Sequence, residues 1–89
     1  MTGAAAREAD IAAIRDALGR FGRLSVSAGS VAPETDLYGV GFTSHAAVNV
    51  MLALEDAFDI EFPDELLTRA TFGSIAALAD AVSRTRAAA

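Results

Sequence analysis

The sequence has no cysteine, no lysine and no tryptophan, and it has only one histidine. Without cysteine the chain can form neither a disulfide nor a thiolate metal site. The single histidine, His45, directly follows Ser44, and neighbouring helix residues point about 100° apart, which disfavours a nucleophile–base pair. The acidic residues also lack the spacing and central glycine of a calcium loop. The sequence therefore predicts no catalytic residues and no metal site.

Long apolar runs are also missing. No stretch approaches the roughly 18 consecutive apolar residues of a membrane span, and the first residues lack the basic region and apolar run of a secretory signal. The absence of cysteine fits a cytoplasmic protein. A length of 89 residues suits one domain, 1–89, and we expect its core to span about residues 5–86 with frayed ends. These features predict a soluble, cytoplasmic protein with no membrane partner.

Charge is distributed unevenly along the chain. Seven arginines stand against twelve acids, giving a net charge of −5. No basic residue lies between Glu34 and Glu65, where the carboxylates are Glu34, Asp36, Glu55, Asp56, Asp59, Glu61, Asp64 and Glu65. A nucleic-acid-binding protein would concentrate the opposite charge, so we expect no nucleic-acid partner. Two compatible interpretations remain, a solvated surface and a surface that steers basic partners toward the protein.

Apolar spacing predicts three main helices and one short one, with no strand-like alternation. The first covers Ala5–Phe21 and should end near Arg20–Arg23. A long loop, Leu24–Thr43, follows, and a loop of this length in a small domain is usually functional. Pro63 opens a short helix over Asp64–Arg69, and Ser74 caps the last helix. The apolar positions that we expect in the core are Ile11, Ile14, Leu18 and Phe21 in the first helix, Leu24, Val26, Val31, Leu37, Val40 and Phe42 in the loop, and Ile75, Leu78, Ala79 and Val82 in the last helix.

The clearest helix covers Ser44–Phe58. Its buried stripe is predicted to contain Ala47, Val50, Met51, Leu54 and Phe58. A second stripe contains Val48, Leu52 and Glu55 and lies away from the first. Val48 and Leu52 either form a contact surface for a partner or widen the buried stripe, and the pattern alone leaves both possibilities open.

Ser44 stands at the start of this helix, after a turn that contains Gly39 and Gly41. One interpretation is that Thr43 or Ser44 caps the helix. The other is covalent modification, because an exposed hydroxyl at a helix N-terminus is a favourable place for an anionic phosphodiester. The residues alone favour capping.

Four short segments flank Ser44 in a fixed order and spacing, namely Asp36-Leu37, Ala53-Leu54-Glu55, Phe58-Asp59 and Pro63-Asp64-Glu65. Together they resemble the central region of acyl carrier proteins, in which the serine bears 4′-phosphopantetheine. The resemblance implies an all-α, acyl-carrier-protein-like four-helix bundle of three main helices, one short helix and a long first loop. It further implies that 4′-phosphopantetheine, taken from coenzyme A, is attached covalently to Ser44.

The family's Asp-Ser-Leu motif is replaced here by Thr43-Ser44-His45. Together with Asp36-Leu37-Tyr38 and the segment Met51–Asp64, this variant is similar to the aminoacyl carrier proteins charged by ligases related to seryl-tRNA synthetase. That resemblance implies an aminoacyl thioester as cargo. It also implies three partners, a phosphopantetheinyl transferase, an amino acid:carrier protein ligase or another acyl-activating enzyme, and a downstream acceptor enzyme.

In this scheme the chain is not an enzyme but a partner of enzymes, and a monomer suits an arm that visits several of them. The helix that begins at Ser44 is the surface they recognise. We expect partner contacts from Thr43, His45, Val48, Asn49, Leu52, Glu55 and Asp56, with the acids steering basic partners. One alternative is a carrier of acyl chains for fatty-acid, polyketide or nonribosomal peptide synthesis. Another is a helical interaction module that is never modified.

Overall fold

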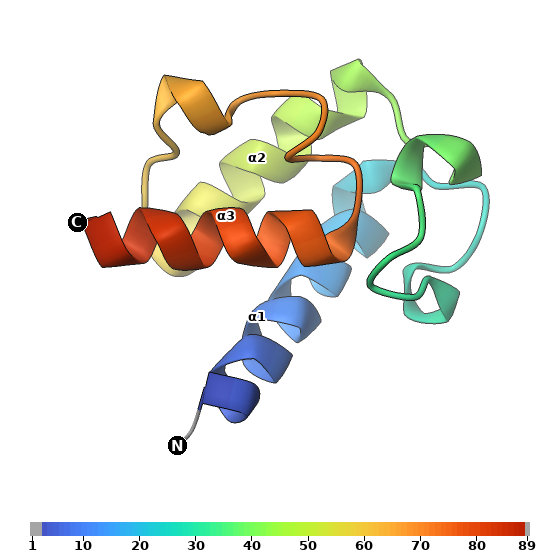
Figure 1. Ribbon diagram of the computed structural model, residues 1–89. Helices are drawn as coiled ribbons and strands as arrows, with labels where there is room; N and C mark the ends of the chain where they lie inside the picture. The colour runs from blue at the N-terminus through green and yellow to red at the C-terminus, as the bar shows by residue number, and fades with distance from the viewer. Residues whose placement is uncertain (1–2, 89) are drawn as a thin grey trace.

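Three α-helices frame the computed structural model, which describes residues 3–88 (Figure 1). They are α1 (Gly3–Ala17), α2 (Ser44–Phe58) and α3 (Ile75–Ala88), and the described residues contain no strand. The all-α prediction is therefore confirmed, and α1 and α3 extend slightly beyond the predicted core of residues 5–86. The prediction of frayed ends falls partly on residues 1, 2 and 89, which lie outside the described part.

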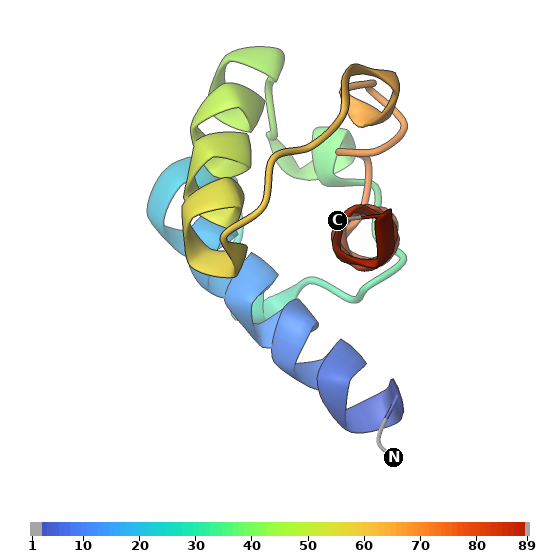
Figure 2. The same cartoon turned by 90° about the vertical axis from the view of Figure 1, so that its left-hand side faces the viewer.

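α1 holds the other two helices together. It packs against both α2 and α3, and Figure 2 shows α2 and α3 on opposite sides of the molecule, with the segment that links them crossing between. Because each helix turns its apolar stripe inward, the side chains meet in one cluster. The completely buried members of this core are Ile14, Leu37, Val50, Leu54, Ile75, Leu78 and Val82.

The end of the first helical segment differs from a regular α-helix. A π-helical turn, η1 (Leu18–Gly22), follows α1, and Arg23 ends it in the left-handed conformation, as the predicted boundary near Arg20–Arg23 required. Ile14 and Leu18 are buried as expected, whereas Phe21 is 41% exposed. The prediction for Phe21 was wrong because a π-helix has more residues per turn, which carries this position off the buried stripe.

The predicted long loop is ordered by two short 3₁₀-helices, η2 (Ala28–Ser30) and η3 (Leu37–Val40). Val31, Leu37 and Phe42 are buried and fix the loop to the core, as predicted. Val26 is 43% exposed, so its prediction as a core contact was wrong. It lies in the irregular stretch before η2, where no helical period directs the side chain inward.

Backbone hydrogen bonds join the same loop to the start of α3. The Leu37 amide donates to the Gly73 carbonyl at 2.8 Å, and the Ala76 amide donates to the Pro33 carbonyl at 2.9 Å. These bonds give partners to backbone N–H and C=O groups that would otherwise be buried without a hydrogen bond. The loop is therefore held in place, and it fixes the position of the N-terminus of α2, which directly follows it.

α2 matches its predicted bounds and ends at Asp59, which adopts the left-handed conformation (φ 53°). Val50 and Leu54 are completely buried. Ala47, Met51 and Phe58 are only half-buried. Phe58 was expected in the core, but it is partly buried and packs against the core from its edge.

The remaining elements also follow the sequence pattern. After α2, a single 3₁₀ turn, η4 (Asp64–Leu66), takes the place of the predicted short helix. The Ser74 hydroxyl accepts the Ala77 amide at 3.0 Å and caps α3 as expected. All four positions predicted for the stripe of α3 are buried. Within residues 3–88, none of the helices combines the length and the apolar character needed to cross a membrane.

Candidate functional site

The turn before α2 sets the direction in which the chain enters that helix. The Asp36 carboxylate accepts the Tyr38 amide at 3.1 Å and begins η3. Gly41 ends η3 with φ of 100°, a conformation that residues with a Cβ rarely adopt. A Cβ at Gly41 would also lie 3.1 Å from the Ser25 amide nitrogen. This glycine therefore lets the loop pass close to Ser25 and then direct Phe42 into the core.

Thr43, and not Ser44, caps α2. The Thr43 hydroxyl accepts the Ala46 amide at 3.1 Å, and the Thr43 backbone is extended, as an N-cap requires. Ser44 is the first residue of the helix, and its side chain is exposed. The sequence left the cap open between the two residues, and the structure assigns it to Thr43. The Ser44 hydroxyl is therefore available at the positive end of the helix dipole.

An apolar strip continues from Ser44 along the exposed side of α2. Val48 and Leu52 follow Ser44 at four-residue steps, and each is 53% exposed. They therefore do not widen the buried stripe, which was one of the two possibilities that the sequence left open. Two large aliphatic side chains beside an exposed serine form the kind of helix face that docks into an apolar groove of a partner.

The other predicted contact residues divide into two groups. Thr43, His45, Asn49 and Asp56 are exposed around the same strip. Glu55 is half-buried, and its carboxylate accepts the Phe62 amide at 3.0 Å. Glu55 therefore holds the link after α2 in place, a role that the sequence pattern did not reveal.

A hollow lies directly beside Ser44. We call it the Ser44 hollow; its volume is about 370 Å³, and it is lined by Tyr38, Ser44, Ala47, Val48, Met51, Leu67, Thr68, Arg69 and Phe72. It lies between α2 and the segment that leads into α3, and its surface is mostly apolar. Its size falls at the lower end of the roughly 300–1,000 Å³ typical of small-molecule sites. The far wall was not predicted, because the short helix expected over Asp64–Arg69 carries no apolar stripe that would mark a site and residues 70–72 follow it.

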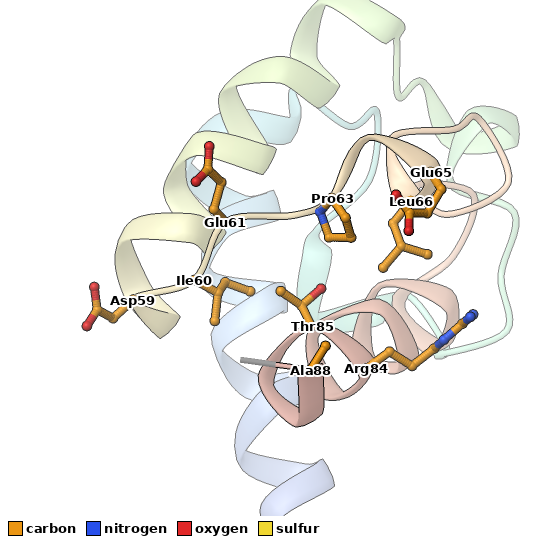
Figure 3. Close-up of a pocket in the computed structure, with 9 residues that line it drawn as sticks. All are labelled: Asp59, Ile60, Glu61, Pro63, Glu65, Leu66, Arg84, Thr85 and Ala88. Atoms are coloured by element: carbon orange, nitrogen blue, oxygen red, sulfur yellow. The ribbon is translucent and has the colours of Figure 1, made fainter.

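A larger hollow, of about 740 Å³, lies elsewhere and does not include Ser44. Figure 3 shows it between the link after α2 and the C-terminal half of α3, with the carboxylates of Asp59 and Glu61 directed away from its middle and Arg84 on α3. Among the described residues, no three histidine or carboxylate side chains gather closely enough to hold a metal ion. This open, mixed-charge hollow offers no converging groups for chemistry.

Comparison with known proteins identifies a family that this chain matches. A family model described as a phosphopantetheine attachment site matches residues 11–82. An aminoacyl carrier protein of Agrobacterium fabrum is 51% identical over 71 residues, which cover 80% of this chain and 86% of that protein.

Solved structures agree with the sequence comparisons. A carrier protein from Agrobacterium tumefaciens, crystallised with ATP and an engineered glycine:carrier protein ligase of Bradyrhizobium japonicum, matches with a TM-score of 0.81 and 48% identity. That match covers 84% of this chain and 97% of the other. A glycylated carrier protein bound to the Bradyrhizobium japonicum ligase matches with a TM-score of 0.71 and 30% identity, over 82% of this chain and 97% of the other.

Proposed function

The chain belongs to the phosphopantetheine attachment site family, and from this premise we propose that it is an aminoacyl carrier protein whose Ser44 bears 4′-phosphopantetheine. The observation that carries the proposal is that two different residues cap α2 and present a free hydroxyl at its start. Thr43 supplies the cap, while Ser44 presents an exposed hydroxyl. A serine needed only for capping would itself accept an amide hydrogen bond, as Ser74 does at α3.

The surroundings of Ser44 suit such a group. Its attachment point is a phosphodiester, and the amide groups at the N-terminus of α2 favour a negative charge there. When bound, the group supplies a thiol, which the cysteine-free chain lacks. The described residues around Ser44 include no base positioned to activate its hydroxyl, since exposed His45 is its sequence neighbour and points to another side. Activation therefore has to come from the transferase, and this chain is its substrate.

An aminoacyl cargo is supported by the comparisons. The Agrobacterium fabrum relative is an aminoacyl carrier protein, and the structural relatives were solved with a glycine:carrier protein ligase, one of them in a glycylated form. Glycine is accordingly the first amino acid to test. We expect the ligase to dock on the strip formed by Val48 and Leu52, and a downstream acceptor enzyme to use the same surface. Coenzyme A and ATP are both available in the cytoplasm, where we expect the protein to act as a monomer.

Intact-protein mass spectrometry tests the attachment step. The unmodified protein is incubated with coenzyme A and a broad-specificity phosphopantetheinyl transferase, with Ser44→Ala as the control. We expect a gain of one phosphopantetheine on the wild type alone. No gain on folded wild-type protein would favour an interaction module that is never modified.

A second reaction tests the cargo. The loaded protein is incubated with ATP, glycine and a glycine:carrier protein ligase, and in parallel with an acyl-activating enzyme and its acid. We expect a further gain of one glycyl group that hydroxylamine removes, because this nucleophile cleaves a thioester and releases the thiol. Loading only by the acyl-activating enzyme would instead support the alternative of an ordinary acyl carrier.

A further inference from the structure

Arg69 occupies an unusual position in the charge pattern. It is the only arginine between Arg23 and Arg84, and the chain has no lysine, so it is the one permanent cation in the middle of the sequence. In the fold it lies on the wall of the Ser44 hollow. Arg69 is thus the basic residue that lines the same hollow as Ser44.

Tyr38 holds Arg69 at two points. The Tyr38 hydroxyl donates to the Arg69 carbonyl at 3.1 Å, and the Arg69 guanidinium carbon lies 3.7 Å from the centre of the Tyr38 ring. Stacking on an aromatic ring fixes the plane of a guanidinium group while leaving its N–H donors on the edge available. Tyr38 itself is held by the turn that Asp36 begins. The guanidinium is therefore oriented by the same turn that presents Ser44.

Among residues 3–88, the donors of Arg69 have no acidic partner. Arg7, Arg20 and Arg86 each pair with an aspartate. Arg15, Arg23, Arg69 and Arg84 form no ion pair with the described residues, and of these four Arg69 is the one that stacks on an aromatic ring. A stacked guanidinium without a counter-ion suits an anion, because its fork of donors matches two oxygens of a phosphate. The only anion that the proposed function brings to this hollow is the phosphodiester on Ser44.

We propose that the Tyr38–Arg69 pair is a receptor for the phosphodiester of the arm and that it seats the adjoining part of the arm in the Ser44 hollow. This inference rests on the proposed function, because the occupant is the group attached to Ser44. Arg69 neutralises the phosphodiester together with the α2 N-terminus, while the apolar wall of Val48, Met51, Leu67 and Phe72 receives the methyl-bearing part of the arm. The pair is a positioning device: it aims the arm along α2, toward the surface on which partners dock.

The test uses protein already loaded with phosphopantetheine, so that attachment is verified by mass before the arm is studied. Wild type, Arg69→Gln and Arg69→Lys are compared with Arg84→Gln, which removes an exposed arginine outside the Ser44 hollow. The phosphorus NMR shift is measured against that of the same protein unfolded in urea. Cross-peaks between the arm's methyl protons and the Met51 methyl group report whether the arm lies in the hollow.

We expect the wild type and Arg84→Gln to show the cross-peaks and a phosphorus shift distinct from that of the unfolded protein. Arg69→Gln should lose the cross-peaks and move its phosphorus shift toward the unfolded value, while the unloaded variant still unfolds in one cooperative transition. Arg69→Lys, which keeps the charge but not the fork, should fall between them. Unchanged spectra in loaded Arg69→Gln would overturn this inference alone, whereas wild-type protein that accepts no arm would overturn the proposed function and the inference with it.

Discussion

Arg86, near the end of α3, holds the carboxylate of Asp10 in α1 with two hydrogen bonds. Nη2 lies 2.6 Å from Oδ2, and Nη1 lies 3.1 Å from Oδ1. The Asp10 side chain is only 8% exposed, while that of Arg86 is 41% exposed. The guanidinium carbon also lies 5.5 Å from the centre of the Phe58 ring at the end of α2. One arginine thus connects the three main helices at the end of the molecule opposite Ser44.

Asp10→Asn should destabilise the fold, because it replaces the buried carboxylate that accepts two hydrogen bonds from Arg86. We expect a loss of about 1–3 kcal/mol, the cost of leaving a buried polar group poorly satisfied, since the exposure of Arg86 keeps the effect below that of a fully buried pair. Asp80→Asn is the matched control: its partner Arg7 also joins α1 to α3, but both side chains are well exposed. The control should cost less than about 1 kcal/mol. Urea denaturation measures both, and equal losses would contradict the prediction.

Leu52 and Leu54 separate the two roles of α2. Leu54 is completely buried and Leu52 is 53% exposed, although they are two residues apart on one helix. Leu54→Ala should lower the free energy of unfolding by about 2–5 kcal/mol through lost burial and a cavity. Leu52→Ala should change it by less than about 1 kcal/mol but raise the KM for the protein in ligase charging. A normal KM for Leu52→Ala would remove this side chain from the docking surface.

Gly41→Ala tests whether the turn before Ser44 depends on a left-handed residue. A Cβ there meets the Ser25 amide nitrogen at 3.1 Å in a backbone conformation with φ of 100°. We expect a loss of about 1–3 kcal/mol from backbone strain. Gly39→Ala, in the same turn, places its Cβ at an ordinary 3.5 Å from the Asp36 carboxylate and should be tolerated. Equal melting temperatures for the two variants would show that a local shift relieves the strain at Gly41.

The acidic surface predicts that charging weakens as salt is added. The Debye length falls from about 8 Å at physiological ionic strength to about 3 Å at 1 M, so added salt screens the attraction between exposed carboxylates and a basic partner. Asp56→Asn should raise the KM for the carrier severalfold with little change in kcat, because it slows encounter with a basic partner. Glu8→Gln, which removes one exposed charge from α1, is the control. A flat salt response would count against steering.

The sequence predicted the features that depend on residues close together in the chain and missed those that depend on distant contacts. The bounds of α2 and the stripe of α3 were correct because burial at three- and four-residue steps is determined within one helix. Phe21 was misplaced because nothing in the apolar pattern announces a π-helical turn. The contact between Tyr38 and Arg69 joins residues 31 positions apart and depends on how the loop packs against the segment before α3, so no local pattern contains it. For the same reason, Glu55 was assigned only to the outer surface.

Thr43 and Ser44 provide the sharpest test of the proposed site, because removing one hydroxyl should lower stability and removing its neighbour should abolish modification. Thr43→Ala removes the N-cap bond to the Ala46 amide and should cost about 1 kcal/mol, which in a domain of this size lowers the melting temperature by about 4–8 °C. It should still accept the arm. Ser44→Ala removes an exposed side chain that is not the cap, so its melting temperature should stay close to that of wild type, yet it should accept no arm at all. The reverse pattern, with Ser44→Ala the less stable of the two, would make Ser44 the true cap and remove the structural argument for its modification.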